Sequence, residues 1–221
     1  MLAVFPETVR TASAVACPVC DLQSPCVAQA SKTFDAEEEI YGEGEPAEWV
    51  FRVVSGAVRV FTMLDDGRRQ IHAFHFPGDV FGLENGADYS QSAEAICETR
   101  VEIGRWTVLD AASAQDCQTA RKLWLLTAEA LRRASEHLVM LGRKTARERV
   151  AGFLVEMQRR TGRQNVVDLP MSRIDIADYL GLTIETVSRT LNEFQRTGLI
   201  DLPRCRHVRL CNSRLLDAMA A

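Results

Sequence analysis

The residue pattern changes near position 106, and this change limits the fold more than any other feature of the chain. Residues 37–104 contain short runs rich in Val, Phe and Ile, several of them alternating, separated by turn signals such as Asp66-Gly67. Residues 106–141 contain neither Pro nor Gly, and their apolar residues recur at helical spacing. Strands followed by helices predict an α+β protein, in which a β-roll or barrel precedes a helical part.

A narrow apolar seam runs along the predicted long helix. Apolar or small side chains recur every seven residues in two series, which is the a/d spacing of a coiled coil. A partner helix would cover such a seam, and a two-fold homodimer is the commonest arrangement that supplies one. Packing of the same face on the β-roll remains an alternative. The two series are Trp124, Leu131, Leu138 and Thr127, Ala134, Leu141.

Charge is divided unevenly along the chain. The formal net charge is −4, which taken alone argues against a nucleic-acid partner. Residues 143–221 contain 14 Arg or Lys and 9 Asp or Glu, a net charge of +5, whereas residues 1–142 contain 12 and 21, a net charge of −9. A basic C-terminal third attached to an acidic remainder predicts a module that binds a polyanion, unless the clustering is chance.

The basic third has the pattern of a helix-turn-helix followed by a hairpin. Ser172 precedes a helical pattern and Asp175 follows three residues later, which is close to a capping box. Gly181 ends that helix, and Thr183 can cap the next one. Further on, apolar residues flank the basic segment 203–206, which predicts a hairpin, or wing.

The second helix of this motif has two different faces. The apolar residues expected to pack inward are Ile184, Val187, Leu191 and Phe194. On the outward face, an arginine can donate two hydrogen bonds to guanine and a glutamate can accept one from cytosine. A plain surface ion pair between Glu185 and Arg189 is the alternative. The residues expected to contact bases or phosphates are Ser172, Arg173, Thr183, Glu185, Thr186, Ser188, Arg189, Arg204 and Arg206.

The segment MSRIDIADYLGLTIETVSRTLNEFQRTGLI, residues 171–200, closely resembles the DNA-binding helices of the CRP/FNR transcription regulators, most of all the FNR/FixK branch. In that branch an E-x-x-S-R set reads a TTGAT-type half-site, and it matches Glu185, Ser188 and Arg189. The resemblance continues through GRRQIHAFHFPGDVFGLENG, which is similar to the family's β-roll sensor domain, and covers roughly residues 37–212.

The resemblance implies both a fold and a function. The implied order is a Cys-containing segment (1–30), a cupin-like β-roll of the cyclic-nucleotide-binding-domain type (31–108), a long dimerisation helix (109–142) and a winged helix-turn-helix (143–221). The implied function is a transcription regulator of the activator type, which binds a TTGAT-like palindrome in double-stranded DNA as a homodimer. It would contact RNA polymerase and control genes of the anaerobic response or of nitrogen fixation.

The roll is not expected to bind a cyclic nucleotide. Family members that do so hold the phosphate with an Arg-Ser pair after a PGD-x-x-G turn. Residues 71–99 of this chain contain no Lys or Arg, and five acidic residues make the segment negative. A buried phosphate would therefore lack a compensating cation, which is costly.

Three cysteines near the N-terminus are candidate metal ligands. Cys17, Cys20 and Cys26 have the C-x2-C-x5-C spacing that resembles the first three ligands of the [4Fe–4S] cluster in FNR. Glu102 aligns with the family's fourth cysteine, and the nearest thiol is Cys97. An iron–sulfur cluster, a zinc or redox role, and no metal all remain open. A redox sensor whose DNA binding depends on these thiols is therefore the alternative function.

Membrane and enzyme functions find little support in the sequence. No run approaches the roughly 18–20 apolar residues that span a bilayer, and the first residues lack the basic start of a signal peptide. The four histidines are scattered, and no nucleophile–base motif is present. We therefore expect a cytoplasmic protein that is not an enzyme.

Overall fold

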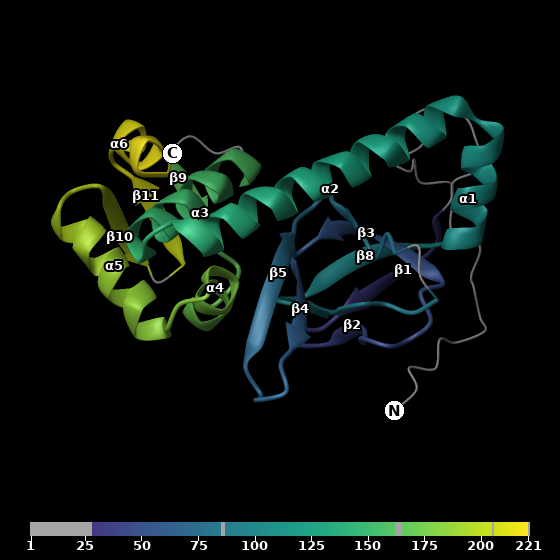
Figure 1. Cartoon of the computed structure of the whole chain (residues 1–221), viewed down its shortest axis with the longest axis horizontal. Helices are drawn as coiled ribbons and strands as arrows, with labels where there is room; N and C mark the ends of the chain where they lie inside the picture. The colour runs from purple at the N-terminus through teal and green to yellow at the C-terminus, as the bar shows by residue number, and fades with distance from the viewer. Residues whose placement is uncertain (1–27, 85–86, 162–164, 205, 221) are drawn as a thin grey trace. The chain divides into compact units, whose positions relative to one another are not determined.

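The computed structural model describes residues 28–84, 87–161, 165–204 and 206–220 (Figure 1). The chain divides into two compact units. The first contains Ala73–Leu131 and the described residues up to Thr62, and the second contains Met63–His72 and Arg132–Ala221. The tip of one hairpin, Met63–His72, therefore belongs to the same unit as the C-terminal helices.

Two four-stranded sheets form the β-roll (Figure 1). Their strand orders are β1-β8-β3-β6 and β2-β7-β4-β5. The strands are β1 (Ala28–Phe34), β2 (Glu39–Tyr41), β3 (Trp49–Ser55), β4 (Val58–Met63), β5 (Arg69–His75), β6 (Val80–Phe81), β7 (Ser92–Ala95) and β8 (Thr99–Arg105). The predicted roll is confirmed. Strand β1 lies before the residues that were predicted as strands, and it gave no signal because its sequence AQASKTF has few β-branched or aromatic residues.

The predicted turn at Asp66-Gly67 joins β4 to β5. Gly67 adopts a φ of +83°, a backbone conformation that glycine reaches without steric cost. The backbone N–H of Leu64 donates to the carbonyl of Arg68 at 2.8 Å and closes the turn. The hairpin prediction is confirmed.

The expected single helix over residues 109–142 is wrong at its start. The structure has two helices, α1 (Trp106–Gln115) and α2 (Cys117–Arg143), separated by Asp116 in an extended conformation. The Asp116 carboxylate accepts hydrogen bonds from the Thr119 hydroxyl at 2.6 Å and from its backbone N–H at 3.0 Å, so it caps α2. These bonds lower the pKa of Asp116. Neither Gly nor Pro marks this break, which is why the sequence pattern did not reveal it.

The second unit contains the predicted helix-turn-helix and wing (Figure 1). Its small sheet has the order β10-β11-β9. The elements are α3 (Ala146–Thr161), β9 (Val166–Asp168), α4 (Arg173–Leu180), α5 (Ile184–Arg196), β10 (Ile200–Arg204), β11 (His207–Leu210) and α6 (Ser213–Ala220). The α+β class is confirmed. Strand β9 and helix α6 are additions that the sequence analysis did not predict.

Among the described residues, no helix is both long enough and apolar enough to cross a bilayer.

Candidate nucleic-acid interface

Helix α4 begins with the predicted capping box. The Ser172 hydroxyl accepts from the Asp175 backbone N–H at 3.1 Å, and the Asp175 carboxylate accepts from the Ser172 backbone N–H at 2.9 Å. These reciprocal bonds satisfy N–H groups that a helix start leaves unpaired. Ser172 is thus occupied in capping, and Asp175 is buried.

The turn between α4 and α5 depends on Gly181. Its φ is +60°, and a Cβ at this position would lie 3.4 Å from a Leu141 methyl carbon and 3.5 Å from an Arg149 nitrogen. A larger residue would therefore be both strained and crowded. Thr183 then caps α5, because its hydroxyl accepts from the Thr186 backbone N–H at 3.2 Å.

Arg149 is a structural residue of this site that the sequence analysis missed. Its guanidinium donates to the carbonyl of Leu180 at 2.8 Å, at the end of α4, and to that of Leu141 at 2.8 Å, near the end of α2. It also donates to the carbonyl of Lys144 at 2.9 Å. One side chain therefore satisfies carbonyls that two helix ends would leave unpaired.

Helix α5 has an apolar face and a polar face, largely as predicted. Val187, Leu191 and Phe194 are buried, whereas Glu185 and Arg189 are exposed. Ile184 was expected to pack inward and instead is 38% exposed. It is the first residue of α5, and side chains in a first turn point back past the helix start rather than onto the core.

The outward residues of α5 differ in how they are held. Hydrogen bonds from its own backbone N–H and from the Thr183 hydroxyl lower the pKa of Glu185, and the Arg189 charge adds to this effect. The carboxylate is therefore ionised at neutral pH and able to accept hydrogen bonds. Within the described ranges Arg189 makes no side-chain hydrogen bond or ion pair, so the alternative of a Glu185–Arg189 ion pair is not formed in the structure.

Two of the predicted contact residues lie side by side although they come from different helices. Arg173, the first residue of α4, donates to the Ser188 hydroxyl of α5 at 3.2 Å. This bond joins the start of α4 to the middle of the outward face of α5. The structure thus brings together two residues for which the sequence predicts contacts with DNA.

The wing presents basic side chains at its tip. Arg204 pairs in the β10–β11 ladder with His207, and both Arg204 and Arg206 are exposed. His207 pairs through Nδ1 with the Asp168 carboxylate of β9. In the described part of the chain the guanidinium groups of Arg204 and Arg206 have no carboxylate partner, so both can bind an external anion.

Helix α2 exposes the predicted seam. Trp124, Leu131 and Leu138 are 67%, 68% and 73% exposed, and Ala134 is exposed as well. Leu141 is half-buried. Large apolar side chains this exposed are typical of a surface that another protein covers.

Comparison with known proteins identifies the family. Residues 148–219 match the Crp-like helix-turn-helix domain, and residues 31–110 match the cyclic nucleotide-binding domain. The nitrogen fixation regulation protein FixK of Azorhizobium caulinodans is 48% identical over 209 residues, which cover 92% of this chain and 80% of that protein. The chain belongs to the CRP/FNR superfamily, in its FixK-like branch.

Two further relatives agree with this placement. The transcriptional activator protein Anr of Pseudomonas aeruginosa is 37% identical over 83% of this chain and 77% of its own length. The structure of FixK2 from Bradyrhizobium japonicum superposes with a TM-score of 0.84 at 51% identity, covering 87% of this chain and 97% of that one. The FixK-like protein is thus a DNA-binding transcription regulator and not an enzyme.

The interior of the FixK-like roll is filled by stacked aromatic rings. The centroids of Tyr41 and Tyr89 lie 3.8 Å apart, and those of Phe51 and Phe81 lie 5.2 Å apart. The Tyr89 hydroxyl donates to the carbonyl of Trp49 at 2.6 Å, and burial raises the pKa of Tyr89 to about 12. These rings are part of the hydrophobic core of the roll, and the absence of cyclic-nucleotide binding stays a prediction.

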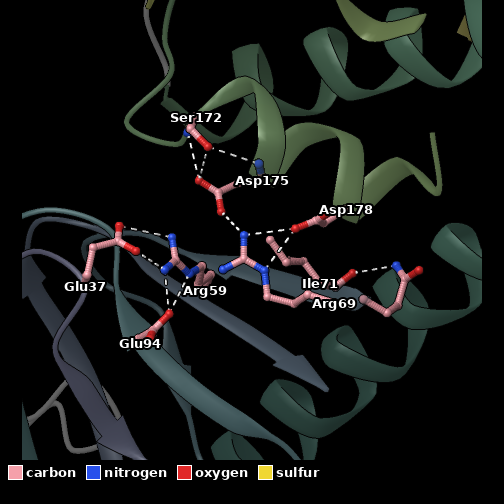
Figure 2. A network of polar contacts seen from close by, with 9 residues as sticks. Glu37, Arg59, Arg69, Ile71, Glu94, Ser172, Asp175 and Asp178 are labelled. Carbon is pink, nitrogen blue, oxygen red and sulfur yellow. Dashed lines mark hydrogen bonds and ion pairs between the residues drawn. The ribbon is translucent and has the colours of Figure 1, made fainter. Parts of the chain in front are cut away.

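Two arginines of the FixK-like roll, buried Arg59 and half-buried Arg52, already have carboxylate partners. Arg59 binds Glu37 and Glu94 (Figure 2), the latter at 2.5 Å. Arg52 binds Glu102 at 2.5 Å. Neither cation is therefore available for a ligand phosphate.

The cysteine prediction is only partly addressed by the structure. Cys17, Cys20 and Cys26 lie outside the described residues. Cys97 is half-buried, with its Sγ 4.0 Å from the Thr99 hydroxyl. Glu102, at the position of the family's fourth cysteine, is buried in its ion pair. The described ranges contain no group of three or more His, Cys, Asp and Glu that could hold a metal ion.

Proposed function

We propose that this FixK-like regulator binds a TTGAT-like palindrome as a homodimer through the outward face of α5. The set of exposed Glu185, half-buried Ser188 and exposed Arg189 carries the proposal. Its main member is the Arg189 guanidinium, which no described side chain binds. An unpaired guanidinium on a helix narrow enough for the major groove is suited to bidentate hydrogen bonds with guanine.

Each residue of the site receives a distinct role in this proposal. Arg189 reads a guanine, Glu185 accepts from the cytosine or adenine side of the same half-site, and Ser188 supports them. The remaining residues bind the phosphate backbone and set the position of the protein on the duplex. They are Arg173, Thr183, Thr186, Arg204 and Arg206. Ser172, whose hydroxyl donates to Asp175, instead caps α4.

The exposed seam of α2 supplies the dimer contact. Trp124, Leu131 and Leu138 recur every seven residues, so in two-fold pairing they would meet the same residues of a second chain. Ala134 and Leu141 complete the contact. Two reader helices would then face half-sites whose centres lie roughly 10–11 base pairs apart.

The relatives suggest which genes are controlled. Several carry the name nitrogen fixation regulation protein FixK, and others are named transcriptional activators. We therefore assign this chain to the activation, through RNA polymerase, of genes linked to nitrogen fixation or oxygen limitation. It would act in the cytoplasm, with a roll over 31–108, a dimer helix within 109–142 and a DNA-binding domain over 143–221.

Fluorescence anisotropy with two labelled duplexes tests the proposal. One duplex contains two TTGAT half-sites in inverted orientation, and the other contains the same bases shuffled. The palindrome should bind roughly a thousandfold more tightly than the shuffled duplex, and both affinities should fall steeply with salt. Equal affinity for the two duplexes would rule out sequence-specific reading by α5.

A second candidate function rests on the spacing of Cys17, Cys20 and Cys26. Three thiolates on one short segment suit an iron–sulfur or redox centre, but the buried Arg52–Glu102 pair does not fit a fourth thiolate ligand. Protein purified without oxygen, together with a Cys20→Ser variant, separates the candidates. Brown, iron-containing protein that loses both colour and DNA affinity in the variant would favour the sensor, whereas iron-free protein with full DNA affinity would exclude it.

A further inference from the structure

The tip of the β4–β5 hairpin binds the first helix of the helix-turn-helix, and both lie in the second unit. Arg69, at the start of β5, donates through Nη2 to Asp175 Oδ1 at 2.6 Å and through Nε to Asp178 Oδ2 at 2.9 Å. Figure 2 shows the guanidinium between these two carboxylates of α4. The side chains of Arg69 and Asp175 are largely or fully buried, so solvent screens this contact little.

Asp175 divides its two carboxylate oxygens between two tasks. Oδ2 accepts from the Ser172 backbone N–H at 2.9 Å and from the Ser172 hydroxyl at 2.7 Å, which caps α4. Oδ1 accepts from Arg69. A buried carboxylate without a cation is costly, so the cap of α4 depends on the arginine of the hairpin.

The other end of α4 is bound in a similar way. The carbonyl of Tyr179 accepts from Gln70 of the hairpin at 3.5 Å and lies 2.8 Å from Nε2 of His137. The His137 ring also stacks on the Tyr179 ring at 4.1 Å, and burial lowers the pKa of His137. Nε2 is the donor in this bond, because a carbonyl oxygen can only accept. Neighbouring hairpin residues thus bind α4 near both its ends.

We infer that Arg69 is a positioning residue for DNA binding. It sets the orientation of α4, and α4 in turn places Arg173 against Ser188 on the reading face of α5. Arg69 performs this task without touching DNA, and this role deepens the DNA-binding function proposed above and rests on it.

The test compares Arg69→Ala with Arg68→Ala as a matched control. Arg68 is the neighbouring arginine, but it is exposed, and among the described residues its side chain pairs with Asp66 of the turn alone. Arg69→Ala should weaken binding to the TTGAT palindrome roughly tenfold more than binding to shuffled DNA, because the reading face is misplaced. The slope of log affinity against log salt should stay at the wild-type value, because no phosphate contact is lost. Arg69→Lys should recover part of the specific affinity, and Arg68→Ala should behave as wild type.

A readout without DNA separates this inference from the proposed function. Hydrogen exchange of the backbone amides at the start of α4 should accelerate in Arg69→Ala relative to those of α3, and Arg69→Lys should restore part of the protection. Wild-type affinity with unchanged exchange in Arg69→Ala would overturn the inference. So would a salt slope reduced by about one, because that change marks a direct phosphate contact. Failure of the proposed function appears instead in the wild-type protein, as equal binding of palindrome and shuffled DNA.

Discussion

In the β-roll, Arg52 and Arg59 bind buried or half-buried carboxylates, whereas in the DNA-binding unit Arg189 and Arg204 are exposed and bind no described side chain. Arginine side chains thus form internal ion pairs in the roll, whereas in the other unit they are available to bind an external anion. Arg69 belongs with the first kind by its contacts, although it lies in the second unit.

This difference bears on the expectation that the roll binds no cyclic nucleotide while the second unit binds DNA. A phosphate-binding site needs a cation that the protein does not already neutralise. Buried Arg59 and half-buried Arg52 are already neutralised by carboxylates, and we expect them to contribute to stability instead. The exposed arginines contribute little to stability, because surface charges are well solvated, and can therefore be used for recognition.

The largest loss of DNA affinity is expected from breaking the proposed dimer, because this separates the exposed arginines of the two chains. In Leu131→Glu/Leu138→Glu, buried carboxylates of the two chains would face each other at both positions, so the protein should become monomeric. Affinity for the full palindrome should then fall roughly 10²–10⁴-fold, because the second half-site no longer binds as part of the same molecule. Light scattering and anisotropy measure the two effects. Gln118→Glu adds a charge to α2 outside the seam and should remain dimeric. A double variant that stays dimeric would show that the seam is not the contact.

Removing a buried arginine tests the other side of the comparison. Arg59→Met leaves Glu37 and Glu94 without their cation and should lower the free energy of unfolding by about 3 kcal/mol, the lower part of the range for a broken buried pair, since Glu37 is largely exposed. Urea unfolding measures the loss. Arg100→Met, at an exposed position of β8, is the control and should lose much less. Equal losses in both variants would contradict a structural role for Arg59.

Arg189→Ala should change specificity and leave stability intact. We expect a loss of about 1–3 kcal/mol per half-site and a relaxed preference at one base pair, because a bidentate contact to one base is removed. Competition with duplexes that vary each base pair of the half-site measures this change. Wild-type preference at every position, together with a slightly lower melting temperature, would instead support a role in surface structure.

Arg204→Ala should cause the smallest loss of DNA affinity and should leave sequence specificity unchanged. A lost phosphate contact should weaken binding to all sequences alike and reduce the salt slope by about one unit. Titrations of the palindrome and of shuffled DNA at several salt concentrations provide the measurement. A loss confined to the palindrome would show that the wing also reads bases.

The sequence by itself determined the features that depend on local chemistry. Gly67 and Gly181 mark turns because their backbone conformations are unfavourable for other residues. Patterns over a few neighbouring residues likewise predict the capping box at Ser172, the periodicity of α5 and the heptad seam of α2. The structure contains all three features. The break at Asp116 is also a local effect, yet aspartate is common in ordinary helices, so its signal was too weak to use.

Only the tertiary structure decided which polar residues are available and which are already bound. Arg69 and Asp178 are 109 residues apart, and Arg52 and Glu102 are 50 apart, so no local spacing connects them. Arg149 is one of several arginines in a basic segment, and only folding brings it to the carbonyls at the ends of α2 and α4. The sequence supplies the charges, but the folded chain determines which of them pair, because desolvation and hydrogen-bond distance exist only once the chain is packed.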